Sequence, residues 1–223
     1  MKIQYKNLES QLWLEDRKIL DLKEAKYKLE SFTYDMKNGI DQYGNYEHFI
    51  DPAMRQTFLE NLLATEAWIY AEGENAPLSE QLGRLEALES IGRPVKSRWI
   101  FRQEFPDYVT IFQKTESQFS ARMGEIPHLT QENRQAIEEK CALMQQFYME
   151  LQQELETRPR YVDPSCTLAQ IEKKQMLFEA EVNAILNKPP PAPKKEEEKK
   201  DGSGEGTAKS AADDAEMNDE GAA

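Results

Sequence analysis

The chain has 223 residues, of which 31% are charged, with a mean hydropathy of -0.78 and a formal net charge of -13 at pH 7. This length supports one sizeable core with a solvated remainder, and the negative charge argues against nucleic acid or an anionic membrane surface as the main partner, because both would repel the chain. No stretch approaches the roughly 18 apolar residues of a membrane span, and the start, MKIQYKNLESQ, lacks the apolar core of a signal peptide.

The first predicted element is a long helix over residues 2–37, which contain neither Pro nor Gly. Its apolar residues follow one seam at spacings of three, four or seven: Leu8, Leu12, Ile19, Leu22, Leu29, Phe32 and Met36. Such a helix would be about 50 Å long at ~1.5 Å per residue. It must therefore either pack along its whole length or project from the fold.

The end of this helix carries the pattern K-x-x-L-E-x-F-x-Y-D-M-K, which consists of Lys26, Leu29, Glu30, Phe32, Tyr34, Asp35, Met36 and Lys37. The pattern resembles the lid signature of the heat-shock protein 110 family, the large relatives of the seventy-kilodalton heat-shock chaperones. The family usually has Asn where this chain has Tyr27. The resemblance implies that the helix face with Tyr27 and Glu30 meets the ATPase domain of a partner chaperone, and the bulky Tyr27 departs from that pattern. For Phe32 and Met36, core packing is the simpler interpretation.

A loop marked by Asn38, Gly39 and residues 42–45 leads to a second helix, with Asp51 as N-cap and Pro52 as its first residue. This helix carries Met54, Phe58, Leu62, Leu63 and Ile69 and closes with Trp68 and Tyr70. Because the long helix is its neighbour in sequence, we expect an antiparallel pair.

Residues 65–98 predict the end of the second helix, a turn, a short helix and a stop. Gly73 lies where a left-handed C-cap is expected. Gly92 and Pro94 should end the short helix, because Gly accepts a positive φ and Pro breaks the hydrogen-bond ladder. The apolar face of the short helix comprises Leu78, Leu82, Leu85, Leu88 and Ile91.

The same residues carry a second resemblance to the heat-shock protein 110 family. The patterns W-I-Y-x-x-G-E and I-G-x-P-V-x-x-R match its C-terminal helical domain through Trp68, Tyr70, Gly73, Glu74, Gly92, Pro94 and Arg98. A helical corner of any all-α protein is the alternative that the spacing alone leaves open.

Beyond Pro94, a helix that kinks or restarts at Pro106 should carry Val109, Phe112, Phe119 and Met123 until Gly124 and Pro127 stop it. Trp99 and Phe101 are more aromatic than the family pattern. They belong either to an exposed contact patch or to the core.

Two further helices are predicted. Thr130 caps the first, whose heptad seam of Ile137, Cys141, Met144, Tyr148, Leu151 and Leu155 could pair with a bundle neighbour or with a second chain. Asp163 and Pro164 should begin the last helix, with its face of Leu168, Ile171, Phe178, Val182 and Ile185. The V-D-P start and the Lys-Pro-rich exit are again similar to the family.

The patterns together predict an all-α fold, in which residues 1–187 form an antiparallel helical bundle with one long N-terminal helix. Residues 188–223 consist mainly of Pro, Lys, Glu, Gly, Ser, Ala and Asp, and they predict a disordered, acidic tail.

Chemistry-bearing motifs are missing from the sequence. It has no phosphate-binding loop or dinucleotide fingerprint, and His48 and His128 lie in separate predicted loops without metal-like neighbours. We therefore expect neither an enzyme nor a metal or cofactor site. Cys141 and Cys166 are too few for a secreted disulfide framework, and DEGAA is not an endoplasmic-reticulum retention signal, so a cytoplasmic location is expected.

The family resemblance implies a non-catalytic domain of a chaperone that acts as nucleotide exchange factor for seventy-kilodalton chaperones by binding their ATPase domain, and that also holds unfolded clients. ATP would bind only in the parent's N-terminal domain, so the chain is either a C-terminal piece of such a chaperone or a product that kept only the helical part. The expected partner-binding residues are Tyr27, Glu30, Trp99 and Phe101. Tyr27 and the two aromatics also suggest an alternative, a structural subunit of a larger assembly that has lost the exchange role.

Overall fold

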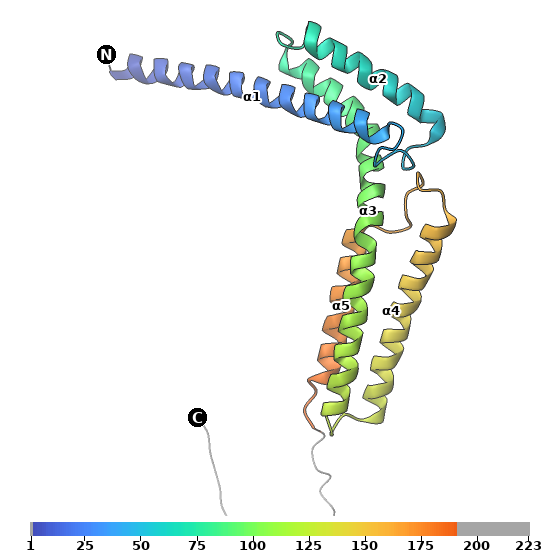
Figure 1. Ribbon diagram of the computed structural model, residues 1–223. Helices are drawn as coiled ribbons and strands as arrows, with labels where there is room; N and C mark the ends of the chain where they lie inside the picture. The colour runs from blue at the N-terminus through green and yellow to red at the C-terminus, as the bar shows by residue number, and fades with distance from the viewer. Residues whose placement is uncertain (1, 191–223) are drawn as a thin grey trace, which may run out of the picture. The chain divides into compact units, whose positions relative to one another are not determined.

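The computed structural model describes residues 2–190, and this part of the chain consists of five α-helices without a strand (Figure 1). The helices are α1 (Lys2–Ile40), α2 (Pro52–Ala71), α3 (Leu78–Glu125), α4 (Gln131–Thr157) and α5 (Leu168–Leu186). The predicted all-α class is therefore confirmed. The tail predicted from residue 188 lies, from residue 191 onward, outside the described residues.

The helices bury two apolar clusters, and α3 contributes to both. The first, here called the α1–α2 cluster, joins the C-terminal half of α1, the following loop, α2 and the first part of α3 around Leu29, Met36, Phe58 and Leu62. The second, the α4–α5 cluster, joins the rest of α3 to α4 and α5 around Phe112, Ile137, Ile171 and Val182. Figure 1 shows α2 antiparallel to α1, as predicted, and α4 and α5 beside the second half of α3.

The helix α3 contradicts the predicted stop at Gly92 and Pro94, because it continues through both residues to Glu125. Gly92 is buried where α1 and α3 approach each other, and a Cβ there would lie 2.6 Å from Cζ of Phe32. The glycine therefore permits close packing and does not cap a helix.

Neither proline of α3 ends the helix. Pro94 and Pro106 each remove one backbone donor, and Pro costs about 3 kcal/mol relative to Ala inside a helix. Leu88 and Val95 are buried in one cluster and Phe101 and Phe105 in the other, so the residues around both prolines pack into cores. That burial offsets the lost hydrogen bonds, which local propensity could not predict.

The turn between α2 and α3 also differs from the prediction. Gly73 does not have a left-handed φ; its N–H donates to the Trp68 carbonyl at 2.9 Å, and a Cβ would lie 2.7 Å from Cα of Ile69. The turn is held by Gln81, whose buried Nε2 donates to the carbonyls of Gly73 at 3.0 Å and Ala76 at 3.3 Å. The sequence patterns do not predict this role, because the residues on either side of Gln81, Glu80 and Leu82, are exposed.

The helix starts were predicted correctly in two cases. The Asp51 side chain accepts from the Ala53 N–H at 2.9 Å, and the Thr130 hydroxyl accepts from the Asn133 N–H at 3.2 Å. The prediction for α5 was wrong, because its N-cap is Thr167, which forms a capping box with Gln170. Asp163 instead pairs with a residue of α3, described below.

The long first helix was expected either to pack along its whole length or to project. The first half of α1 projects beyond the packed helices (Figure 1). Among the described side chains that precede Ala25, none is buried. The predicted apolar seam is therefore a core face only from Leu29 onward, while Leu12 and Ile19 on the same seam are exposed.

Candidate partner-binding surface

A stripe of four large side chains follows the face of α1 that points away from the core. Trp13 is 58%, Leu20 64%, Tyr27 70% and Tyr34 65% exposed. Their spacing of seven places them nearly in line along a helix, opposite the buried Ala25, Leu29 and Met36. We call these four residues the α1 stripe.

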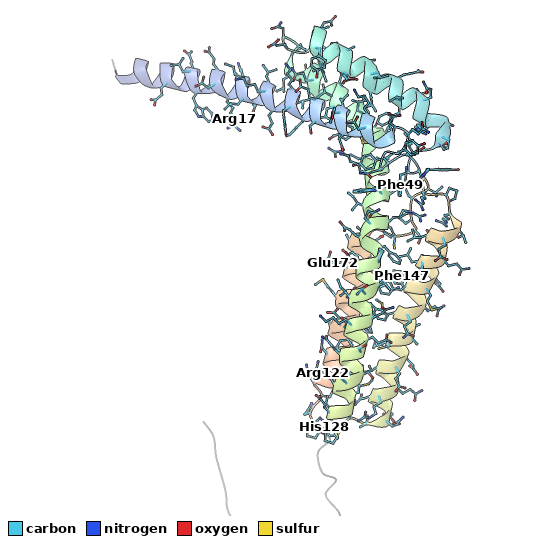
Figure 2. The ribbon with its side chains drawn as sticks, viewed as in Figure 1. Arg17, Phe49, Arg122, His128, Phe147 and Glu172 are labelled. Carbon is cyan, nitrogen blue, oxygen red and sulfur yellow. The ribbon has the colours of Figure 1, made fainter. Side chains whose placement is uncertain are left out.

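The α1 stripe is part of a larger apolar surface at the projecting end of α1. Leu12, Leu14 and Ile19 are also at least half exposed there. The guanidinium of Arg17 lies 5.3 Å from the ring centroid of Trp13, which places a cation on the stripe itself (Figure 2). Charged residues such as Lys23 and Glu24 lie between members of the stripe, but this many large exposed apolar side chains on one helix indicate a site of protein contact.

The structure brings together only two of the four predicted partner-binding residues. Tyr27 and Glu30 lie one helical turn apart on α1, with Tyr27 in the stripe and Glu30 half-buried at its side. Trp99 and Phe101 belong to α3 instead.

The prediction of Phe101 as a contact residue is contradicted by its burial. Its side chain is 3% exposed and stacks on Phe105 with ring centroids 5.9 Å apart, inside the α4–α5 cluster. Trp99 is half-buried and packs edge-on against Tyr46 with centroids 5.5 Å apart. Both aromatics therefore follow the core interpretation, because each helix turn of α3 has one face against a neighbouring element.

Most of the family-motif residues at the end of α1 have structural roles. Leu29 and Met36 are buried, and Phe32 packs on Gly92 of α3. Asp35 forms an ion pair with Lys96, whose ammonium also lies 5.1 Å from the Phe32 ring centroid. Tyr34 is the exception, since it belongs to the exposed stripe.

The motif residues around the turn between α2 and α3 also divide into buried and exposed ones. Trp68 is buried, and the guanidinium of Arg84 lies 4.0 Å from its ring centroid. Tyr70 and Glu74 are exposed at the end of α2 and in the following turn.

Arg98 joins α3 to two loops. Its Nε donates to Asp163 Oδ1 at 2.6 Å, and its terminal nitrogen donates to the Phe49 carbonyl at 3.0 Å. The side chain of Arg98 is only 17% exposed. It therefore connects the α1–α2 loop with the α4–α5 loop, a structural role that agrees with its place in the motif.

Two buried titratable side chains of the described chain, Tyr148 and Cys141, have raised pKa values. Burial raises the pKa of the Tyr148 hydroxyl to about 12 and that of the Cys141 thiol to about 11, so both stay protonated at neutral pH. Tyr148 donates to Gln175 Oε1 at 3.0 Å within the core.

The two histidines lie in loops between helices. His48 is exposed, and His128 approaches the Lys188 carbonyl at 3.2 Å at the other end of the bundle (Figure 2). Within residues 2–190, no three metal-ligating side chains cluster, and no helix has the length and apolar character of a membrane span.

Comparisons with known proteins identify heat-shock proteins among the relatives of the chain. The chain is 28% identical over 188 residues to "Heat shock 70 kDa protein 15" of Arabidopsis thaliana, and 27% identical over 195 residues to "Heat shock protein 110" of Caenorhabditis elegans. It is 25% identical over 191 residues to "Heat shock 70 kDa protein 4" of Homo sapiens. These alignments cover 82%, 84% and 82% of the chain, and 22%, 25% and 22% of the relatives.

No family model matches the chain, and neither does any solved structure. The relatives are heat-shock proteins of the 110 and seventy-kilodalton group, so the resemblance predicted from the motifs is confirmed. The chain spans about a quarter or less of their length.

Proposed function

We propose that this chain, a helical domain homologous to part of the heat-shock protein 110-type chaperones, binds the ATPase domain of a seventy-kilodalton chaperone in the cytoplasm and promotes the release of its nucleotide. The homology supports a chaperone-related role for the domain. The observation that supports the finer proposal is the α1 stripe, whose four large side chains are each more than half exposed.

The proposed mechanism is differential binding. An ATPase domain whose lobes open transiently releases ADP more readily when a partner binds the open arrangement more tightly than the closed one. The α1 stripe suits this task because a projecting helix can lie along a lobe without displacing the two buried clusters of its own fold. The same apolar surface is the place where unfolded clients would be held.

A titration against a nucleotide-bound seventy-kilodalton ATPase domain tests the proposal through binding and through release of labelled ADP. Glu30→Arg should weaken binding about tenfold, which corresponds to ~1.4 kcal/mol, because it reverses a half-buried charge beside Tyr27. Glu172→Arg makes the same change on α5 (Figure 2) and should leave binding within about twofold, or ~0.4 kcal/mol. Equal losses for both variants would show that net charge, and not the α1 face, controls binding.

A structural subunit of a larger assembly is the second candidate function. The exposed Tyr27 favours it, because the family resemblance places Asn there and a bulky ring changes the contact face. Absence of binding at tens of micromolar, with the chain folded by circular dichroism, would favour this candidate.

A further inference from the structure

A second surface lies where the α1–α2 loop, α3 and the α4–α5 loop meet, close to Phe49 in Figure 2. Two hollows of about 350 and 320 Å³ adjoin there, and both are lined by His48 and Arg160. Arg102 of α3 lines the first hollow, and Arg55 of α2 lines the second. Glu47 is the one carboxylate among the described residues that line the two hollows, so basic side chains outnumber acidic ones there, although the chain as a whole carries a formal charge of -13.

The arginines around these hollows fall into two groups. Three have carboxylate partners: Arg55 with Glu47 at 3.6 Å, Arg98 with Asp163 at 2.6 Å and Arg158 with Glu154 at 2.8 Å. Among the described residues, neither Arg102 nor Arg160 has a carboxylate within ion-pair distance, and Arg102 makes only a 3.5 Å contact with the Arg158 carbonyl. Two guanidinium groups therefore remain without a counter-charge.

The charged form of Arg102 is disfavoured at this position. Burial and, second, the nearby charge of Arg160 lower the pKa of the Arg102 guanidinium from its ordinary value. The half-buried Arg102 and the exposed Arg160 are like charges close to each other, and an anion between them would relieve their repulsion. A carboxylate suits this place because a guanidinium donates two parallel hydrogen bonds to it.

The hollows are larger than a small ion, and part of the lining of each is apolar. Phe49, Trp99 and Leu155 line the first hollow, and Ile50, Pro52 and Pro159 line the second. A free anion would fill a small part of this space and would leave the apolar walls in water. An acidic peptide fits better, because it offers carboxylates to Arg102 and Arg160 and an apolar side chain to the walls.

We propose that Arg102, Arg160 and His48, together with these apolar walls, form a docking site for a short acidic peptide segment of a partner protein. The site belongs to a different surface from the α1 stripe. It goes beyond the proposed nucleotide exchange and does not depend on it.

The test measures the binding of a rhodamine-labelled peptide, Glu-Asp-Glu-Phe-Glu-Asp, to the full chain by fluorescence anisotropy at 50 mM NaCl. The amide counterpart, Gln-Asn-Gln-Phe-Gln-Asn, has the same shape without charge. We expect the acidic peptide to bind at least tenfold more tightly than the amide peptide, and to lose affinity at 200 mM NaCl because salt screens the exposed charges.

Two double variants distinguish the contribution of the site to peptide binding from that of net charge. Arg102→Gln with Arg160→Gln should weaken acidic-peptide binding at least tenfold. Lys114→Gln with Lys173→Gln removes the same charge from exposed positions of α3 and α5, and should change binding less than twofold. Circular dichroism of both variants should match the parent chain, because all four side chains lie outside the buried clusters.

Three results would overturn the proposal. The first is equal binding of the two peptides, and the second is equal loss in the two double variants. The third is displacement of the labelled peptide by inorganic phosphate at the same concentration as the peptide, which would assign the site to a free anion. A failure of nucleotide exchange with intact peptide binding would instead contradict only the proposed function.

Discussion

Single residues decide how closely the helices approach, and Gly92 is the clearest case. The sequence predicts a helix stop there from the neighbouring Pro94, since the local chemistry of a stop and of a helix contact looks the same. The structure assigns the glycine to the contact with Phe32 instead. A close approach between distant residues leaves no trace in local sequence, so this role could not be predicted.

Gly92→Ala should therefore destabilise the fold, although Ala is the better helix former. The added Cβ would lie 2.6 Å from Cζ of Phe32, and such overpacking typically costs about 1–3 kcal/mol. The change in the free energy of unfolding is measured by urea denaturation followed by circular dichroism.

Gly83→Ala is the matched control in the same helix. Apart from the backbone of its own helix turn and its chain neighbours, no atom lies within 4 Å of the position of its Cβ, so this variant should gain about 0.5–1 kcal/mol from helix propensity. Stabilisation by both variants would mean that Phe32 yields easily and that the contact with Gly92 is not tight.

Helix ends divide into those that local chemistry determines and those that packing determines. The caps at Asp51 and Thr130 were predicted correctly because a side-chain oxygen accepts from a backbone N–H two or three residues away. The continuation of α3 through Gly92 and Pro94 and the start of α5 were not, because the buried aromatics of α3 stabilise it as one helix across two prolines and Asp163 pairs with Arg98.

Arg98 shows how one side chain connects three elements, and its replacement should cost more than that of its ionic partner. Arg98→Ala removes the donor to the Phe49 carbonyl as well as the pair with Asp163, so about 1–3 kcal/mol of stability should be lost. The measurement is thermal unfolding.

Asp163→Ala tests the ionic part of that interaction by itself. The carboxylate is 70% exposed, and exposed ion pairs contribute about 0–1 kcal/mol, so a loss below 1 kcal/mol is expected. Equal losses for the two variants would contradict a stabilising role for the hydrogen bond to the Phe49 carbonyl.

At the scale of the whole molecule, the fold separates into two buried clusters and a helix end that belongs to neither. The sequence predicts the all-α class and the seams of α4 and α5 well, because heptad spacing and burial coincide there. It could not distinguish the packed and projecting halves of α1, since Leu12 and Leu29 occupy the same seam and differ only in what lies beside them.

The candidate surfaces were predicted in part for the same reason. Tyr27 and Glu30 came from the family pattern, whereas Trp13 and Leu20 extend the stripe in a region without motif matches. The spacing of seven from Trp13 to Tyr34 is visible in the sequence. Only the burial of the opposite face of α1 in the structure shows that these four side chains are exposed. The basic hollow at Arg102 and Arg160 joins segments that are far apart in sequence, so no local pattern indicates it.

Removal of residues 2–20 should leave the folded core intact. None of the described side chains before Ala25 is buried. The free energy of unfolding of the truncated chain, measured in urea, should therefore lie within about 1 kcal/mol of that of the full chain. It should nevertheless lose binding to the ATPase domain, because Trp13 and Leu20 are absent. A large loss of stability would show that the projecting half packs on the fold in solution.

Hydrogen–deuterium exchange of the chain, with and without a nucleotide-bound seventy-kilodalton ATPase domain, measures which helix meets the partner. The partner should slow exchange in residues 12–34 of α1, which carry the stripe, and leave exchange in α4 and α5 unchanged. Protection confined to α4 and α5, or no protection at saturating partner, would contradict the assignment of the α1 stripe as the partner-binding surface.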